Sequence, residues 1–261
     1  MKKTIWITGA GSGIGEALAL AYNHTEHTII LSGRNKTQLE SVSKNILNPY
    51  ILPIDVTQEN QITKAVATIQ SIFGNVDILI NNAGVSQRAT VSETTNDVGR
   101  NLMEVNFFGS VHLTKAILPM MKKANKGSIV AISSAAGKFG FPLRSYYSAS
   151  KHALHGFYES LSLELKDTQI HTMLVCPGRI RTDISKNALT GSGKSHNQMD
   201  QGQLNGIPVE KCASKIIQGI SSKKAELYIG GNEILLIYIK RYFPFLFRLI
   251  AKLCNKTKKK R

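Results

Sequence analysis

Short apolar runs alternate with longer amphipathic stretches along most of the chain. The apolar runs are typical of strands. We expect strands at 4–8, 27–31, 50–54, 77–80, 128–133, 170–176 and 226–229. Periodicity near 3.6 residues predicts helices at 14–24, 35–47, 59–73, 97–121, 146–166 and 209–221. Asn35 is expected to cap the second of these helices, and Pro119 to mark the end of the fourth. The strands are apolar without alternation, as in a sheet covered on both faces.

Strands that alternate with helices of this length predict right-handed βαβ crossovers. The fold class that follows is α/β, a doubly wound parallel sheet of the Rossmann type. With 261 residues, no internal repeat and no linker, the chain suits a single domain. We assign this domain to 1–233, with the polar segment 183–208 as a lid or a disordered loop, and 234–261 to a C-terminal extension.

The charge of the chain is concentrated in that extension. Lys and Arg number 33 against 17 Asp and Glu, which gives a formal net charge of +16. Nine of the basic residues and no acidic residue fall in 234–261. A global basic surface for nucleic acid is therefore not predicted. Glycines interrupt the N-terminal apolar run, so we expect no export signal and a cytoplasmic protein.

The extension is both apolar and basic. Residues 234–239 are wholly apolar, and Arg248, Lys252 and Lys256 repeat every four residues, which predicts an amphipathic helix with a basic face. Its charges argue against a membrane-spanning segment. Two alternatives stay open, namely peripheral contact with the inner face of a membrane, or packing on the domain or on a partner subunit.

A glycine-rich turn lies between the first strand and the first helix. It spans Thr8 to Gly15 with the spacing T-G-x-x-x-G-x-G, which fits neither G-x-G-x-x-G nor a P-loop. Such a turn lets the backbone approach a pyrophosphate at a helix N-terminus, although it is also simply a tight turn. After the second strand, Arg34 stands where an NAD enzyme needs a carboxylate, which favours NADP(H). The alternative for Arg34 is a solvated side chain.

Tyr147 and Lys151 have the spacing Y-x-x-x-K on a predicted helix, so they share one face. A neighbouring ammonium favours the phenolate, and such a tyrosine can act as an acid or base. Ser134 precedes Tyr147 at the carboxyl end of a strand, where open α/β sheets place ligand groups. His152 and His155 follow on the same helix without an apparent third ligand, so we expect surface or interface histidines and no metal site.

Cys176, Cys212 and Cys254 form no C-x-x-C pair, which indicates a reducing compartment and no zinc site. Cys176 is expected in the core.

Further motifs stand in order along nearly the whole chain, at Asp55-Val56, 81–84, Asn106 and 177–182. Together with the glycine turn, Ser134 and Tyr147-x-x-x-Lys151, they resemble the short-chain dehydrogenase/reductase family. Residues 151–157, the lid and the C-terminus are similar to the member-7 branch of the dehydrogenase/reductase group.

The resemblance implies a role for each matched residue. Tyr147 would be the catalytic acid/base, Ser134 would bind the substrate oxygen, Lys151 would lower the tyrosine pKa and hold the nicotinamide ribose, and Asn106 would support a water chain. The residues expected to bind NADP(H) are Gly9, Ser12, Gly13, Ile14, Gly15, Arg34, Asp55, Val56, Asn82, Ala83, Gly84, Tyr147, Lys151, Pro177, Gly178, Ile180 and Thr182.

The function expected is hydride transfer between NADP(H) and a lipophilic carbonyl/alcohol substrate, by a homodimer or homotetramer. The alternative is a non-catalytic NADP(H)-binding scaffold protein.

Overall fold

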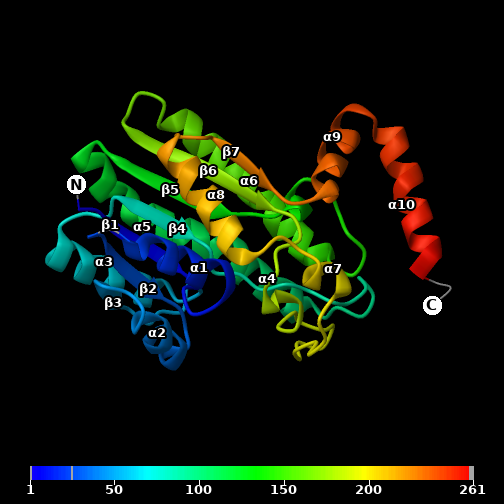
Figure 1. The fold of residues 1–261 in the computed structure, drawn as a ribbon, viewed down its shortest axis with the longest axis horizontal. Coiled ribbons are helices and arrows are strands. Elements are labelled where there is room, and N and C mark those ends of the chain that lie inside the picture. The colour runs from blue at the N-terminus through cyan, green and yellow to red at the C-terminus, as the bar shows by residue number, and fades with distance from the viewer. Residues whose placement is uncertain (1, 25, 259–261) are drawn as a thin grey trace.

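The computed structural model describes residues 2–24 and 26–258, apart from the side chains of His24 and of 252–258. The predictions made above for Lys252, Lys256 and Cys254 concern side chains that lie outside the described part of the structure. Seven parallel strands form one sheet in the order β3-β2-β1-β4-β5-β6-β7, as Figure 1 shows. Their bounds are β1 Thr4–Thr8, β2 Thr28–Ser32, β3 Pro49–Ile51, β4 Ile78–Asn81, β5 Gly127–Ile132, β6 Ile170–Pro177 and β7 Glu226–Ile229.

The strand order reverses between β1 and β4, because the chain crosses from the β3 edge to the other half of the sheet after β3. This reversal is the mark of a doubly wound sheet, and it opens a crevice at the carboxyl ends of the strands. The predicted Rossmann-type fold is therefore confirmed.

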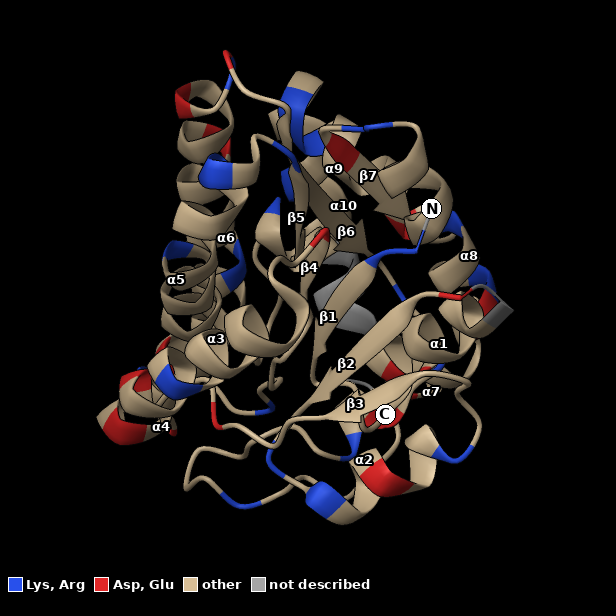
Figure 2. Ribbon diagram, turned by 90° about the vertical axis from the view of Figure 1, so that its left-hand side faces the viewer, with Lys and Arg blue, Asp and Glu red and all other residues tan. Residues whose placement is uncertain are grey.

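Helices cover both faces of the sheet, so its strands are buried on both sides (Figure 2). One layer consists of α1 Gly13–Ala21, α2 Lys36–Ser43 and α8 Val209–Ser221. The other consists of α3 Glu59–Phe73, α5 Gly109–Ala124 and α6 Ser145–Glu164. Trp6 in β1 is fully buried in this second layer and donates its indole N–H to Ser32 Oγ at 2.8 Å.

The helix predicted at 97–121 is three helical pieces. They are α4 Asn96–Met103, a π-helical turn Glu104–Phe108, and α5, which runs past Pro119 to Ala124. The expectation that Pro119 ends the helix is wrong, because the buried side chains of Ile117, Met120 and Met121 flank it and hold the helix against the sheet. The predicted ends of α2 and β3 were also too late, by four and three residues.

The remaining elements form the lid and the extension. The lid holds two short helices, a 3₁₀ turn Asp183–Ser185 and α7 Gln201–Leu204, and it is folded rather than disordered. After β7 come a 3₁₀ turn Asn232–Ile234, α9 Leu235–Tyr242 and α10 Pro244–Lys258. Figure 1 shows α9 and α10 at one end of the molecule, far from β2 and β3.

Candidate active site

A cleft of about 1090 Å³ lies over the carboxyl ends of the strands. Most of the residues that the sequence singled out line it together, although they come from five separate parts of the chain. They are Gly9, Ser12, Gly13, Ile14, Asn82, Ala83, Gly84, Ser134, Tyr147, Lys151, Pro177, Gly178, Ile180 and Thr182.

The glycine turn is held close to the strand beside it. A Cβ on Gly15 would collide with the carbonyl of Gly9, and one on Gly9 would lie 3.0 Å from Ala83. Gly9 also has a φ of +62°, which favours glycine. Asn82 clamps the turn by donating from Nδ2 to the carbonyls of Thr8 and Gly9 at 2.9 and 3.2 Å. The exposed backbone at the start of α1 fits a bound pyrophosphate.

Lys151 lies beneath Tyr147 on α6. Its Nζ is 5.8 Å from the centre of the Tyr147 ring and donates to the Ile132 carbonyl at 2.8 Å. The side chain is buried, and burial lowers the pKa of its ammonium to about 8. The Tyr147 hydroxyl makes no hydrogen bond within the described part of the chain, so it is free to meet a ligand in the cleft.

Ser134 caps the 3₁₀ turn Ala135–Gly137 that follows β5. Its Oγ accepts from the Ala136 N–H at 3.1 Å and donates weakly to the Pro177 carbonyl at 3.3 Å. The cap fixes the hydroxyl at the wall of the cleft that Tyr147 also lines. The two groups can therefore address one substrate oxygen.

Asn106 does not line the cleft but lies behind it, in the π-helical turn. Its side chain exchanges two hydrogen bonds with the backbone of Val85, at 2.8 and 2.9 Å, and donates to Ser150 Oγ at 3.0 Å. These contacts tie the loop after β4 to α6. Asn106 is buried within this π turn, and such turns are frequent at functional sites.

Arg34 lines a second hollow of about 570 Å³ together with Gly9, Gly11 and Ser12. Its guanidinium forms no hydrogen bond or ion pair with any residue that the structure describes. Asp55 and Val56 line neither hollow. The Asp55 carboxylate accepts from the backbone and hydroxyl of Thr57, and Val56 packs against Gly109. Their role in adenine binding stays a prediction.

Gln87 is a buried site residue that sequence reasoning missed. Its Oε1 accepts from the backbone N–H groups of Tyr146 and Tyr147 at 2.9 and 3.3 Å, and its Nε2 donates to Thr94 at 2.9 Å. It therefore caps the N-terminus of α6, where the helix leaves backbone donors without partners. No local signal reveals this, because Gln87 lies 59 residues before Tyr146.

The lid is held down by an ion pair that was also missed. Asp200 accepts from both Arg88 and Arg144, with the Arg144 contact at 3.1 Å. Burial and then the nearby Arg144 charge lower the pKa of Arg88 to about 10. Leu189 adds backbone pairing between the lid and Arg88. The lid is thus docked over the side of the cleft that holds Tyr147.

The expectation that His155 is a surface or interface histidine is wrong, whereas His152 is exposed. The His155 side chain is buried between α6 and the sheet, and its Nε2 lies 3.7 Å from Cys176 Sγ. Cys176 is in the core as predicted. The spacing of His152 and His155 could not show this, because the neighbours of His155 come from β6 and β7.

The cleft, its glycine turn and the Tyr147/Lys151 pair define a class of nucleotide-dependent oxidoreductases. A family profile described as short chain dehydrogenase matches residues 3–192. The chain belongs to this family, the short-chain dehydrogenase/reductases.

Two relatives show which branch of the family the chain resembles. The chain is 41% identical to "Dehydrogenase/reductase SDR family protein 7-like" of Drosophila melanogaster over 271 residues, which cover 98% of this chain and 83% of that protein. It is 37% identical to mouse "Dehydrogenase/reductase SDR family member 7B", over 97% of this chain and 81% of the relative. The resemblance to the member-7 branch is confirmed.

Solved structures agree with this assignment. A short-chain dehydrogenase from Streptomyces avermitilis matches with a TM-score of 0.82 and 29% identity over 100% of this chain and 98% of that one. Two more distant structures show likeness of fold alone. One is a Burkholderia phymatum enzyme in complex with NAD, and the other is a serine dehydrogenase complexed with NADP+, at 22% and 24% identity.

Proposed function

We propose that this oxidoreductase uses NADP(H) and interconverts a carbonyl and an alcohol on a lipophilic small molecule. The observation that carries the proposal is the Tyr147 hydroxyl, free in the cleft, with the Lys151 ammonium buried beneath its ring and Ser134 on the same wall. The nicotinamide would supply or accept the hydride when bound. Family members commonly act on small molecules and form oligomers, and a homodimer or homotetramer is part of the proposal.

Substrate binding, proton transfer and positioning would fall to different residues of the chain. Ser134 would hold the substrate oxygen, and Tyr147 would give that oxygen a proton during reduction or take it during oxidation. Lys151 would keep positive charge beneath the phenol and favour its ionised form. Asn106 would keep the loop after β4 and the helix of Tyr147 in register.

Two observations support a dinucleotide in the cleft. A Cβ on Gly9 or Gly15 would crowd the backbone of the glycine turn, and structures of similar fold were solved with NAD, NADP+ or 5-hydroxy-NADP. The proposed preference for NADP(H) rests on Arg34, which is exposed and unpaired within the described residues and lines the second hollow, whose wall shares Gly9 and Ser12 with the cleft. A planar guanidinium fits a 2′-phosphate well.

The experiment that tests this function is a binding titration of NADPH and NADH by fluorescence, followed by a turnover screen over lipophilic ketones and alcohols. Tight NADPH binding with turnover supports the proposal. Binding without turnover of any compound favours the alternative, a scaffold protein that binds NADP(H) without catalysis. The presence of the complete Ser134, Tyr147 and Lys151 set favours the enzyme.

We also propose that the C-terminal extension contacts a membrane surface. Part of it packs on the domain, since Ile237 and Phe247 join Phe139 in a small apolar cluster, with the Phe139 and Phe247 rings 5.3 Å apart. Other apolar side chains face solvent, and Phe245 is 81% exposed. Large exposed apolar groups beside Arg241 and Arg248 suit an anionic lipid surface.

Within 2–24 and 26–258, none of the helices has the length and apolar content needed to cross a membrane.

A further inference from the structure

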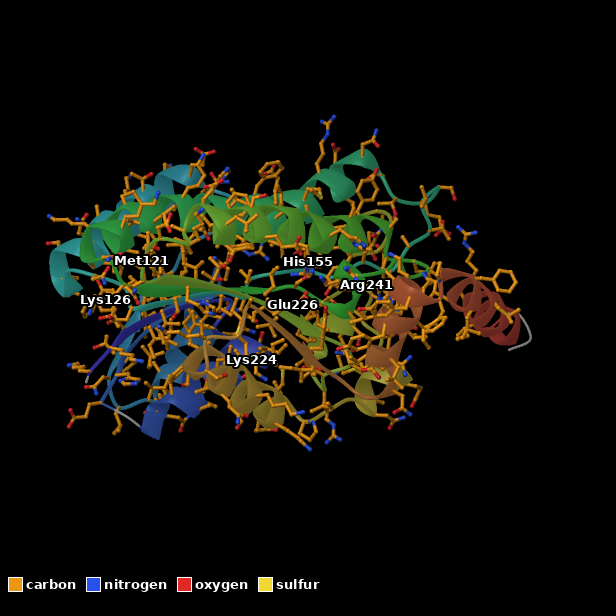
Figure 3. All side chains as sticks on the ribbon, turned by 90° about the horizontal axis from the view of Figure 1, so that it is seen from above. Met121, Lys126, His155, Lys224, Glu226 and Arg241 are labelled. Carbon is orange, nitrogen blue, oxygen red and sulfur yellow. The ribbon has the colours of Figure 1, made fainter. Side chains whose placement is uncertain are left out.

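Behind the cleft, three side chains from separate elements bring metal-binding atoms together. His155 on α6, Cys176 on β6 and Glu226 on β7 each offer one ligand atom, and these atoms lie within 4.8 Å of one another. Cys176 Sγ is 3.5 Å from Glu226 Oε1, and His155 Nδ1 is also 3.5 Å from that oxygen. Figure 3 labels His155 and Glu226, which lie next to each other between the helix and the sheet edge.

His155 can present Nδ1 as a ligand atom. Ser133 Oγ lies 3.2 Å from the carbonyl of Lys151 and 3.0 Å from His155 Nε2. When Ser133 donates to that carbonyl, it accepts from Nε2, and Nδ1 then keeps its lone pair. Nδ1 is buried and has no hydrogen-bond partner among the described residues.

That lone pair faces carboxylate oxygens. Besides Glu226, the exposed Glu159 places an oxygen 3.7 Å from His155 Nδ1. The nitrogen and the carboxylate oxygens are donor atoms from which a cation can be bound, and Cys176 Sγ completes the cluster.

We propose that His155 Nδ1, Cys176 Sγ and Glu226 Oε1 form a binding site for Zn²⁺. Nitrogen, sulfur and carboxylate oxygen are the donors that zinc prefers, and a fourth position is open to water or Glu159. Zinc bonds of about 2.0–2.3 Å in tetrahedral geometry separate ligand atoms by roughly 3.3–3.6 Å. The distances from Glu226 Oε1 to Cys176 Sγ and to His155 Nδ1, both 3.5 Å, match this spacing, and all three ligand atoms lie within 4.8 Å of one another. This proposal reverses the sequence expectation that the chain has no metal site.

Outer contacts hold the ligands in place. The bond from His155 Nε2 to Ser133 fixes the ring as a second partner does in zinc proteins. Tyr228 donates to Glu226 Oε2 at 2.7 Å and leaves Oε1 turned toward the site. On binding, the Cys176 thiol would lose its proton to solvent and coordinate as thiolate.

Lys138 is the competitor for this site. Its ammonium lies 2.7 Å from Glu226 Oε1 and supplies positive charge there. The side chain is partly exposed, so it can turn into solvent when zinc binds. Removing that charge should strengthen zinc binding. A bound ion would link α6, which carries Tyr147 and Lys151, to β6 and β7, and so stabilise the folded state.

The test uses the full chain with Cys254→Ser, so that its cysteines are Cys176 and Cys212. The reduced, chelator-treated protein is titrated with Co²⁺, then with Zn²⁺. We expect one Co²⁺ per chain with a thiolate-to-cobalt absorption band that Zn²⁺ abolishes, and a higher melting temperature with Zn²⁺. Cys176→Ser should remove the band and weaken Zn²⁺ binding at least ~10-fold, whereas Cys212→Ser should keep both.

Two further variants guard against a folding defect. Glu226→Gln, at a partly exposed position, should also weaken Zn²⁺ binding at least ~10-fold, and Lys138→Met should strengthen it. The proposal is overturned if Zn²⁺ does not bind saturably at one per chain, if the band survives Cys176→Ser, or if Glu226→Gln leaves the affinity unchanged. None of these readouts depends on oxidoreductase activity.

Discussion

The Lys151 ammonium lies 5.8 Å from the centre of the Tyr147 ring, one helical turn away on the buried face of α6. Burial lowers the pKa of Lys151 to about 8, from an ordinary value of 10.5, yet leaves the ammonium charged at neutral pH. The charge is therefore available beneath the phenol under physiological conditions. Burying this charge destabilises the folded state, so the free energy of unfolding should depend on pH.

Lys151 should make stability rise with pH between about 8 and 10.5. In that window the unfolded chain holds the lysine proton that the folded protein has released, so raising the pH favours the folded state. The full shift corresponds to about 3 kcal/mol in the free energy of unfolding. Urea unfolding of the chelator-treated, cofactor-free protein at pH 8 and pH 10 measures it. Burial also raises the pKa of the Cys176 and Cys212 thiols, which acts in the opposite direction in every variant. Lys151→Met should therefore lower the slope of stability against pH relative to the wild type, and the exposed control Lys122→Met should not; equal slopes in all three would contradict the burial effect.

Arg34→Ala should weaken NADPH binding by about 1.5–3 kcal/mol and leave NADH binding nearly unchanged. The reason is that Arg34 is unpaired within the described residues and lines the second hollow, and that only NADPH has the 2′-phosphate with which it would pair. Lys36→Ala provides the control, because Lys36 is also basic and close in sequence but pairs with Glu40 on the surface. Equal losses for the two cofactors would show that Arg34 does not bind the 2′-phosphate.

Asp200→Asn should loosen the lid. The change keeps the size of the side chain but removes the charge that neutralises Arg88, whose side chain is only 9% exposed, at a cost of about 1–3 kcal/mol. Limited trypsin digestion should then cleave within 183–208 faster than in the wild type. Asp183→Asn is the matched control, since Asp183 lies in the same lid and pairs with Lys186 at the surface. Unchanged cleavage in Asp200→Asn would mean that this ion pair does not hold the lid.

Phe245→Glu with Leu249→Glu should abolish co-sedimentation with anionic liposomes at low salt, which we expect for the wild type. Both side chains are exposed on α10, so the fold does not depend on them. Point changes test this better than truncation does, because Ile237 in α9 packs on the domain. Leu47→Glu, at another exposed leucine outside the extension, should still pellet. If the wild-type protein stays in the supernatant, the proposal that the extension contacts a membrane is wrong.

The sequence predicted the sheet, and most of the residues that it singled out meet in the candidate site, because both depend on local patterns. Strand runs, helix periodicity and the motif from Tyr147 to Lys151 are short-range features, and α3 and α8 end where the periodicity indicated. The π turn at Asn106 was missed, because the apolar periodicity was interpreted as one continuous helix over 97–121. The partnerships of Gln87, Asp200 and His155 join residues from distant parts of the chain, and only the folded sheet brings them together.

The central claim is that Tyr147 moves the proton during carbonyl/alcohol interconversion, and one comparison tests it most directly. Turnover of the best substrate from the ketone screen is measured with NADPH for the wild type, Tyr147→Phe and Tyr146→Phe. Tyr146 is the neighbouring tyrosine, and its ring packs against Gly99. We predict that Tyr147→Phe loses at least ~10² in turnover while binding NADPH nearly as well as the wild type, and that Tyr146→Phe retains most activity. Turnover near the wild-type rate in folded Tyr147→Phe would contradict the account.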